Sequence, residues 1–452
     1  MWHSSIGNWN GSEPAVRMRR RVFLKSSALA ALSGLAAMGK GARVRAGAKA
    51  RVAIIGGGFG GSACALYLRR LNPALEVNLI DPVVRYASCP MSNEVIGGMR
   101  TMASIRVTRE GVRRAGVQVL GERATGIDLA KHEVRLDGGH SVAFDRLVVA
   151  PGIRFLPQKL PGYTRAAALK MPHAWQAGAE TLRLARQLRA MSDGGIVAIS
   201  VPSGLMRCPP APYERASLIA RYLQRRKPRS KVLILDANNA FPEQDLFTAA
   251  WRRLYPGMIE WIASTEGGAV LRVDPAAMTL YTAGGAHRVA VANVILPQAP
   301  GQLAPDAGLA SAHGWCPVDP LTFESTLMRN VHVIGDACIA DAMPKAASAA
   351  CSQARQCARA IVALLAGREV TAGNFASVCY SVLEPAAAIV HRAEFRIEGG
   401  RILRIGSQVS SVASADAERW YRRIVATAFN EQPADTPAIL GLSAASAQSR
   451  LP

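Results

Sequence analysis

Residues 51–61 read Arg-Val-Ala-Ile-Ile-Gly-Gly-Gly-Phe-Gly-Gly, an apolar run that leads directly into a cluster of glycines. Gly56, Gly58 and Gly61 make the pattern G-x-G-x-x-G, and residues 62–71 have the composition of a helix. Glycines at these positions allow a tight turn and let a pyrophosphate reach backbone N–H groups at the N-terminus of the helix. The stretch therefore predicts a strand, a phosphate-binding turn and a helix, the opening unit of a dinucleotide-binding fold.

An acidic residue follows at the distance that such a fold requires. Residues 76–80 form a second predicted strand, which ends at Asp81, 20 residues after Gly61. A carboxylate at this point binds the ribose hydroxyls of an adenosine. Because strand, glycines, helix, strand and acid occur in this order, we predict a nucleotide site rather than a glycine turn without a ligand.

Two later segments indicate that the nucleotide is FAD. Residues 145–152 read as a strand that ends in a turn at Gly152, and residues 331–336 read as a strand that ends in Gly335-Asp336. These are the second and third contact segments of flavoproteins with two dinucleotide folds, in which the Gly-Asp carboxylate reaches the ribityl chain of the flavin. We therefore expect Gly152, Gly335 and Asp336 to bind the cofactor.

The middle of the chain has a similar strand pattern without the glycine turn. Residues 195–200 and 231–236 read as buried strands, but the first is followed by Val-Pro-Ser-Gly at residues 201–204. Proline and bulky side chains stand where turn glycines would let a pyrophosphate approach. This argues against NADH or NADPH as the reductant.

Composition excludes several classes of protein. The chain has 452 residues and a mass of 48.0 kDa, and its 50% hydrophobic content suits a globular protein of several domains. The formal charge of +22 is spread singly along the chain, so we predict no nucleic-acid partner and consider a basic face that docks an acidic protein. No C-x-x-C or C-x-x-C-H motif occurs, so neither a metal site nor a haem is expected on this chain.

The first 48 residues have the form of an export signal. Residues 20–25 read Arg-Arg-Val-Phe-Leu-Lys, a twin-arginine pattern, and a mildly apolar stretch and small residues follow. The apolar stretch is shorter than the roughly 20 residues that cross a bilayer, so we predict no membrane insertion. We expect a soluble periplasmic protein; the alternative is that residues 1–48 form a basic amphipathic helix of the mature chain.

Four unusual stretches resemble one family of flavoproteins. They lie at residues 86–98, 207–216, 314–319 and 379–385, and they contain Tyr-Ala-Ser-Cys-Pro-Met-Ser-Asn-Glu, Arg-Cys-Pro-Pro-Ala-Pro-Tyr-Glu, Gly-Trp-Cys-Pro-Val-Asp and Cys-Tyr-Ser-Val-Leu-Glu-Pro. Through these stretches the chain, from about residue 51 to residue 429, is similar to the flavoprotein subunit of flavocytochrome c sulfide dehydrogenase. The resemblance implies an α/β protein with two dinucleotide-binding, Rossmann-like domains of the glutathione-reductase type and a C-terminal α+β interface domain.

On this resemblance the chain divides into four parts. Residues 1–48 are the signal peptide, and residues 50–165 and 297–365 together form the FAD-binding domain. Residues 166–296 form a degenerate NAD-like middle domain. Residues 366–452 form the interface domain, which would carry Cys379 back to the flavin.

The resemblance also implies a set of site residues. Cys89 matches the cysteine that holds FAD covalently, and Cys208 and Cys379 match the partners of a redox-active disulfide beside the flavin. Glu214 matches an acidic residue close to that disulfide, and Trp420 is similar to a tryptophan near the C-terminus of the family. For the cysteine pair the alternative is an ordinary stabilising disulfide of an exported protein. For Glu214 it is a surface or helix-capping carboxylate.

The chemistry of these residue types agrees with sulfide oxidation. Hydrosulfide attacks a disulfide sulfur to give a persulfide and a free thiolate, and Glu214 could take the remaining proton if burial raised its pKa towards neutrality. A helix beginning near Ala346 would point its N-terminus, and Lys345, at the edge of the flavin where negative charge develops on reduction. Alternatively, Lys345 lies in solvent. The other five cysteines are expected to be packing residues: Cys64, Cys316, Cys338, Cys351 and Cys357.

We therefore predict a periplasmic FAD-dependent sulfide:cytochrome c oxidoreductase that forms a heterodimer with a c-type cytochrome subunit. A sulfide:quinone oxidoreductase at the membrane surface is the second hypothesis, but the segment from residue 415 onward is rich in charges and poorly suited to insertion. The third hypothesis is a non-catalytic flavoprotein that stabilises a sulfur-oxidising complex. The presence of all three site cysteines disfavours it.

Overall fold

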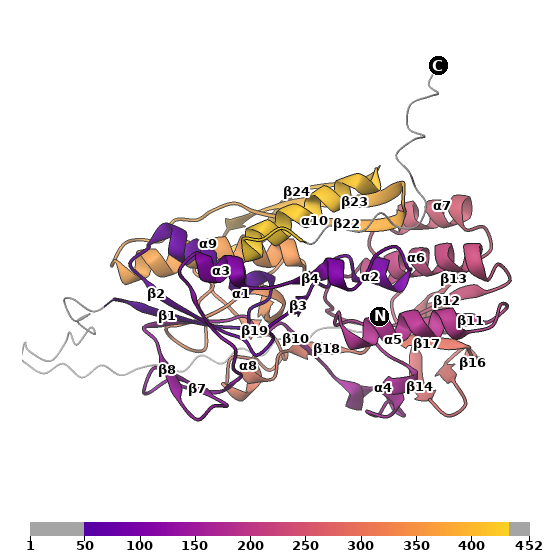
Figure 1. The fold of residues 1–452 in the computed structure, drawn as a ribbon, viewed down its shortest axis with the longest axis horizontal. Helices are drawn as coiled ribbons and strands as arrows, with labels where there is room; N and C mark the ends of the chain where they lie inside the picture. Colours follow the sequence, from indigo (N-terminus) through magenta and orange to yellow (C-terminus); the bar gives the residue numbers. More distant parts are fainter. Residues whose placement is uncertain (1–48, 434–452) are drawn as a thin grey trace, which may run out of the picture. The chain divides into compact units, whose positions relative to one another are not determined.

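The computed structural model describes residues 49–433 (Figure 1), so the predicted export signal lies outside the described residues. A parallel sheet with the order β20-β9-β1-β2-β5 comes first. Its strands are β1 (Arg51–Ile55), β2 (Glu76–Ile80), β5 (Gln118–Leu120), β9 (Arg146–Val149) and β20 (Val331–Val333). The chain leaves this sheet after β9 and returns to it at β20. The middle of the sequence is therefore inserted between two neighbouring strands of the same sheet.

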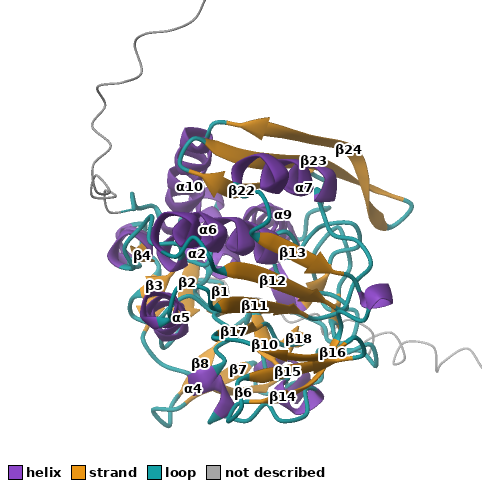
Figure 2. Cartoon of the chain, turned by 90° about the vertical axis from the view of Figure 1, so that its right-hand side faces the viewer, coloured by secondary structure: helices purple, strands orange, loops and turns teal. Residues whose placement is uncertain are grey.

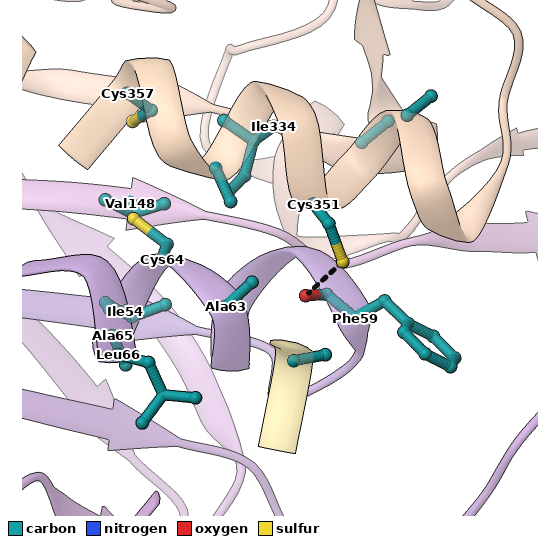
Figure 3. Close-up of a cluster of buried hydrophobic side chains, with 14 of the residues drawn as sticks. Ile54, Phe59, Ala63, Cys64, Ala65, Leu66, Val148, Ile334, Cys351 and Cys357 are labelled. Carbon is teal, nitrogen blue, oxygen red and sulfur yellow. Dashed lines mark hydrogen bonds between the residues drawn. The ribbon is translucent and has the colours of Figure 1, made fainter. Parts of the chain in front are cut away.

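Small side chains bring two helices together beside the first sheet. Helix α1 (Phe59–Leu71) begins three residues earlier than the sequence predicts, and it packs against α9 (Ala347–Leu365). Figure 3 shows Cys64 and Ala63 of α1 beneath α9, next to side chains of the sheet such as Ile54 and Val148. Small thiol and methyl groups let the two helix backbones approach closely. The predicted packing role of five cysteines is confirmed, since each is buried: Cys64, Cys316, Cys338, Cys351 and Cys357.

The middle domain repeats this plan. Its parallel sheet has the order β13-β12-β11-β17 and consists of β11 (Ile196–Val201), β12 (Lys231–Asp236), β13 (Ile259–Ile262) and β17 (Val291–Val294). Helices α5 (Ala179–Ala190), α6 (Ala211–Arg226) and α7 (Gln244–Leu254) accompany this sheet and contribute apolar side chains to its core (Figure 2). Two parallel sheets with helices beside them confirm the predicted α/β class with two Rossmann-like units.

A third sheet is antiparallel and lies against both preceding parts. It consists of β22 (Phe375–Glu384), β23 (Ala387–Glu398) and β24 (Arg401–Val412), and α10 (Ser414–Phe429) follows it. A tight turn joins β22 to β23, and the resulting register places Cys379 directly opposite His391. Strand β22 contacts α9 of the first domain and α6 of the middle domain (Figure 1). The C-terminal sheet therefore brings late residues of the sequence to the junction of the two earlier domains.

The remaining elements are short, and none of them supplies a membrane span. They are β3 (Tyr86–Ala87), α2 (Ser92–Ile96), β4 (Arg106–Val107), α3 (Glu110–Arg114), β6 (Ala124–Asp128), β7 (Glu133–Leu136), β8 (Ser141–Ala143), β10 (Ile153–Phe155), α4 (Ala167–Lys170), β14 (Val270–Asp274), β15 (Thr279–Thr282), β16 (Gly285–Arg288), β18 (Gln298–Pro300), α8 (Leu303–Asp306), β19 (Cys316–Pro317) and β21 (Cys338–Ile339). Between residues 49 and 433, no helix combines the length and the apolar character that crossing a membrane requires.

Candidate active site

The glycine turn after β1 has the shape of a phosphate-binding loop. A Cβ atom at Gly61 would lie 1.9 Å from the carbonyl oxygen of Gly56, so only glycine fits there. At Gly58, by contrast, the nearest neighbour of an added Cβ would be the hydroxyl of Tyr86 at 3.9 Å. Gly58 is also the N-cap of α1, and no side chain caps this helix end. The N–H groups of the first turn therefore face an open space that suits an anion.

Asp81 holds this turn in place. Its Oδ2 atom accepts a hydrogen bond of 2.5 Å from the backbone N–H of Gly57, and it lies 3.1 Å from Nη2 of Arg109. Arg109 is buried and donates from Nε and Nη2 to the carbonyl oxygen of Gly57 at 3.0 and 2.9 Å. Sequence reasoning missed Arg109, because it lies 52 positions from the glycine that it contacts. The ribose role of Asp81 stays a prediction.

The turn after β20 places Asp336 beside a cationic side chain. Gly335 has a φ of 77°, which bends the chain sharply at the end of the strand. The Asp336 carboxylate lies 3.9 Å from Nη1 of Arg207, a loose ion pair that leaves oxygen lone pairs available. Burial raises the pKa of Asp336, and the charges of Arg207 and Lys345 oppose this shift. Such a carboxylate suits hydroxyl groups of a ligand. The second contact residue, Gly152, also has a positive φ, of 65°.

These observations pass a test of fit for FAD. A glycine turn with an open side and an uncapped helix N-terminus suits a pyrophosphate, and Asp336 provides acceptors for hydroxyl groups. Cys89 lies between β3 and α2 and is half-buried, with its Sγ atom 4.0 Å from the carbonyl oxygen of Trp175. Burial lowers the pKa of Arg207, but the charges of Cys89, Asp336 and other neighbours outweigh this effect and raise it. Covalent attachment through Cys89 stays a prediction.

The structure brings Cys208 and Cys379 to one cavity of about 150 Å³. Cys208 precedes α6 in the middle domain and has a φ of 52°, and its backbone N–H donates a hydrogen bond of 2.9 Å to the carbonyl oxygen of Lys345. Cys379 comes from β22 of the C-terminal sheet. Both are half-buried free thiols in this structure. Burial raises the pKa of Cys379 to about 11 and that of Cys208 well above its ordinary value, so neither thiol ionises readily. Their pairing as a redox disulfide stays a prediction.

Glu214 is held next to this cysteine pair. Its Oε2 atom accepts a hydrogen bond of 2.7 Å from Nδ2 of Asn93, and its Oε1 atom accepts one of 2.8 Å from the backbone N–H of Val382. Glu214 thus connects α6, α2 and β22, and its charge acts on both cysteines. Burial raises the pKa of Glu214 to about 7, even though the two hydrogen bonds oppose the shift. The carboxylate therefore has the proton affinity that the sequence argument required of it.

Lys345 does not lie in solvent. Its Nζ atom donates hydrogen bonds of 2.8 and 2.9 Å to the carbonyl oxygens of Asp336 and Cys338, and it lies 3.8 Å from the centre of the Trp315 ring. Burial lowers the pKa of Lys345. The solvent alternative is therefore wrong. Helix α9 begins at Ala347, one residue after the expected start, and no side chain caps it. The approach of Lys345 to a flavin stays a prediction.

Trp420 lies on α10 and contacts the opposite face of β22. Its ring centre is 5.4 Å from that of Tyr380, and successive residues of a strand point to opposite faces, so Tyr380 and Cys379 face different sides. Trp420 is not among the residues that line the cysteine cavity. Its buried Nε1 atom has no hydrogen-bond partner among the described residues, which leaves a donor available. Its role in flavin binding stays a prediction.

Aromatic side chains surround the carboxylate from which the middle domain would bind a second nucleotide. Asp236 ends β12, the position from which a carboxylate binds a nucleotide ribose in such folds. Here the carboxylate is fully buried and accepts hydrogen bonds from the Tyr213 hydroxyl at 2.6 Å and from Nε1 of Trp261 at 2.9 Å. Phe241 stacks on Tyr213 with ring centres 3.7 Å apart. This packing supports the argument that the middle domain does not bind NADH or NADPH. In the described part of the chain, no group of three His, Cys, Asp or Glu side chains could hold a metal ion.

Comparison with known proteins assigns the family. The sequence profile of the central region of the sulfide dehydrogenase (flavocytochrome c) flavoprotein chain matches residues 181–297, and the pyridine nucleotide-disulphide oxidoreductase profile matches residues 50–191. The sulfide dehydrogenase flavoprotein chain of Chlorobaculum thiosulfatiphilum is 49% identical over 45 residues, which cover 10% of this chain and 94% of that sequence. The mitochondrial sulfide:quinone oxidoreductase of Mus musculus is 24% identical over 300 residues, which cover 63% of this chain and 65% of that one.

Among solved structures, the fold is similar to that of the sulfide:quinone oxidoreductase from Aquifex aeolicus. The TM-score is 0.68 at 18% identity, over 85% of this chain and 93% of that one. This likeness shows the fold. The matching profiles, the Chlorobaculum thiosulfatiphilum relative and the fit of the glycine turn to FAD agree with this fold. The chain is therefore an FAD-dependent oxidoreductase that belongs to the sulfide dehydrogenase family of flavoproteins.

Proposed function

We propose that the protein is the flavoprotein subunit of a periplasmic sulfide dehydrogenase, which oxidises sulfide at Cys208 and Cys379 and passes electrons through FAD to a c-type cytochrome. One observation carries the proposal: two cysteines that are 171 positions apart in the sequence share a cavity, with Glu214 beside them. Two packing cysteines would not need a shared cavity or a carboxylate of raised pKa. The family to which the chain belongs, and the sulfide named in its relatives, support the same substrate.

The proposed reaction begins with the two cysteines joined as a disulfide. Hydrosulfide attacks one sulfur, so a new S–S bond forms, the Cys208–Cys379 bond breaks, and the other cysteine leaves as a thiolate. The persulfide then releases its proton to Glu214, whose pKa of about 7 lets it accept the proton near neutral pH. When the thiolate and the deprotonated persulfide then join as Cys–S–S–S–Cys, two electrons are released, and FAD, when bound, would accept this electron pair.

Cys89 is proposed to hold the FAD covalently. It lies near Arg207 and Asp336, in the region where the glycine turn and the β20 turn meet. Flavin fluorescence should therefore stay with the acid-precipitated, denatured chain, and Cys89→Ala should release the flavin into the supernatant. Free FAD from the denatured unaltered protein would contradict the attachment.

The electron acceptor distinguishes a sulfide dehydrogenase, which reduces a cytochrome, from a sulfide:quinone oxidoreductase. The likeness to the mouse and Aquifex aeolicus enzymes favours a quinone as the alternative acceptor. However, the apolar face of α10, which includes Tyr421, Val425 and Phe429, is buried against the protein, so this helix does not offer that face to a membrane surface. The strongly basic chain is better suited to an acidic protein partner. The twin-arginine pattern of residues 20–25 supports export to the periplasm.

Stopped-flow spectroscopy of the bound flavin tests the whole proposal. Sulfide should bleach the flavin of the unaltered protein, and Cys208→Ser and Cys379→Ser should slow bleaching at least about a thousandfold. Dithionite should still bleach both variants, because the glycine turn and Cys89 hold the flavin independently. A structural disulfide predicts the reverse, with sulfide reduction kept and unfolding stability lowered by up to about 5 kcal/mol. Turnover with a c-type cytochrome but not with a soluble quinone would separate the two acceptors.

A further inference from the structure

A second ionisable pair faces the cysteine cavity and has no part in the reaction proposed above. The Nδ1 atom of His391 lies 2.6 Å from Oε1 of Glu243, and its Nε2 atom lies 3.0 Å from Oγ of Ser407. The Glu243 side chain is 4% exposed and that of His391 is 28% exposed. The carboxylate thus lies inside the protein, while one edge of the imidazole reaches the solvent. A buried carboxylate that orients an imidazole fixes which ring nitrogen accepts a proton.

The strand register places this imidazole next to the reactive sulfur. Cys379 and His391 are directly opposite in the β22–β23 ladder. Residues paired in this way point to the same face of the sheet, with Cβ atoms about 4.5–5.5 Å apart. Both side chains line the same cavity, together with Cys208 and Glu243. The imidazole is therefore positioned to meet any small molecule that reaches the cysteine pair from this side.

The backbone of Glu243 is unusual for a glutamate. Its φ of 58° lies in the left-handed region, at the N-cap of α7 and directly after Pro242. Glycine or asparagine adopts this conformation at lower cost. A glutamate here gains no helix-capping hydrogen bond from its side chain, which bonds to His391 instead. The Glu243 side chain therefore contacts His391 from a backbone conformation that is unfavourable for glutamate.

The cavity that His391 lines also has a cationic side chain. Arg404 lines the cavity from β24, and its guanidinium lies over the ring of Phe395. The other titratable groups that face His391 are Glu243 on α7, Cys379 on β22 and Cys208 before α6. Glu214 lies beyond the cysteine pair, where it is bound to Asn93 and Val382. The Arg404 guanidinium would stabilise hydrosulfide relative to neutral dihydrogen sulfide in this cavity.

We propose that His391, oriented by Glu243, accepts the first proton of dihydrogen sulfide in this cavity and so delivers hydrosulfide to the cysteine pair. This inference rests on the proposed function and adds to it a catalytic residue, His391, and a positioning residue, Glu243. In the step, an S–H bond breaks and an N–H bond forms at Nε2, giving hydrosulfide and an imidazolium, and no electrons move. The hydroxyl of Ser407 turns away from Nε2, and the proton leaves through the exposed edge of the ring. Glu214 then accepts the second proton, which the persulfide releases.

The test compares kcat/KM for sulfide at two pH values in the purified holoprotein. At about pH 6 most sulfide is dihydrogen sulfide, and His391→Gln should lower kcat/KM about 100-fold, the usual loss on removing a general base. At about pH 9 the substrate is already hydrosulfide, so the loss should be less than about twofold. Glu243→Gln, which keeps an acceptor for Nδ1–H, should show a smaller loss that is also confined to low pH. His140→Gln is the matched control. His140 also pairs with a glutamate, since its Nε2 atom lies 3.4 Å from Oε1 of Glu122, but it does not line the cavity.

Four outcomes decide between the possibilities. A loss in His391→Gln that is equal at both pH values would show a structural role and overturn this inference alone, as would full activity at about pH 6. If His391→Gln does not fold, the pH dependence of Glu243→Gln decides in the same way. An unaltered protein whose flavin is bleached by dithionite but never by sulfide would overturn the proposed function itself, and the inference with it. Melting curves confirm that the compared proteins are equally folded.

Discussion

The two parallel sheets have one architecture, but the connections that follow their first strands differ. After β1, residues 56–58 form a short glycine turn, and α1 starts at once with its N–H groups uncapped. After β11, the corresponding connection runs over residues 202–210, and α6 starts after two prolines. The first connection leaves space for an anion. The second carries Cys208 instead, with Glu214 in the first turn of the helix.

The difference shows how a nucleotide-binding unit can keep its fold and change its chemistry. In the middle domain, the carboxylate of Asp236 at the end of β12 accepts hydrogen bonds from Tyr213 and Trp261. The sheet therefore keeps its core, while side chains of the protein bind this carboxylate. The same end of the domain places Cys208 in the cavity that Cys379 of β22 also lines. The same fold thus presents an open glycine turn in one domain and a cysteine in the other.

The largest expected effect lies at the first of these connections and the start of the helix that follows it. Gly61→Ala should abolish FAD binding, because its Cβ would lie 1.9 Å from the carbonyl oxygen of Gly56 and the turn would have to open. Gly58→Ala should fold normally and weaken FAD retention by about tenfold, since its Cβ would occupy only the open side of the turn. The flavin content of the purified proteins measures both. An unchanged flavin content in Gly61→Ala would show that the glycine turn after β1 does not determine cofactor binding.

Acid pH should weaken both regions through one buried histidine in each. Burial lowers the pKa of His332 on β20 to about 4 and that of His173, before α5, to about 3. A folded-state pKa below the unfolded value of 6.5 means that the unfolded chain binds the proton first. Stability is therefore full above pH 6.5 and falls as the pH drops towards the folded pKa. Between about pH 7.5 and 5, each histidine should cost about 2 kcal/mol of unfolding free energy.

Denaturant unfolding of single variants assigns this acid sensitivity. His332→Phe should flatten the pH dependence by about 2 kcal/mol over that range, whatever its effect at neutral pH. Since His332 belongs to the first sheet and His173 packs beside Arg215 of the middle domain, the two variants report on the two regions separately. An unchanged slope in His332→Phe would show that other groups control the acid transition.

The smallest effect is expected at Asp236, the carboxylate that ends β12 in the middle domain. Tyr213→Phe removes the hydrogen bond of 2.6 Å to Asp236, and it should lower the unfolding free energy by about 1–2 kcal/mol because Asp236 keeps its bonds to Trp261 and Asn238. The flavin should stay bound. NADH and NADPH at millimolar concentration should reduce it no faster than buffer in either protein. Rapid bleaching by either nucleotide would show that the aromatic packing does not exclude the cofactor.

Sequence reasoning succeeded where the signal is local. The glycine turn, the strand that ends in Gly335-Asp336 and the missing turn after β11 all depend on residues that are close together in the chain, so spacing alone predicts them. The environment of Glu214 does not depend on such residues, since its partners Asn93 and Val382 lie 121 and 168 positions away. The pairing of His391 with Glu243 spans 148 positions. Only the packing of β22 and β23 against α6 and α7 brings these groups together, and no short pattern encodes that packing.

The contribution of β22 has a consequence for how the protein matures. Cys379, which faces Cys208, and Val382, which binds Glu214, both lie on this one strand, more than 160 residues after the groups that they meet. During synthesis from the N-terminus, the glycine turn and both parallel sheets are complete before β22 exists. The residues of the glycine turn are thus in place long before Cys208 and Cys379 can meet. If these two cysteines react with sulfide as proposed, each new molecule becomes reactive towards sulfide only after its last sheet has docked.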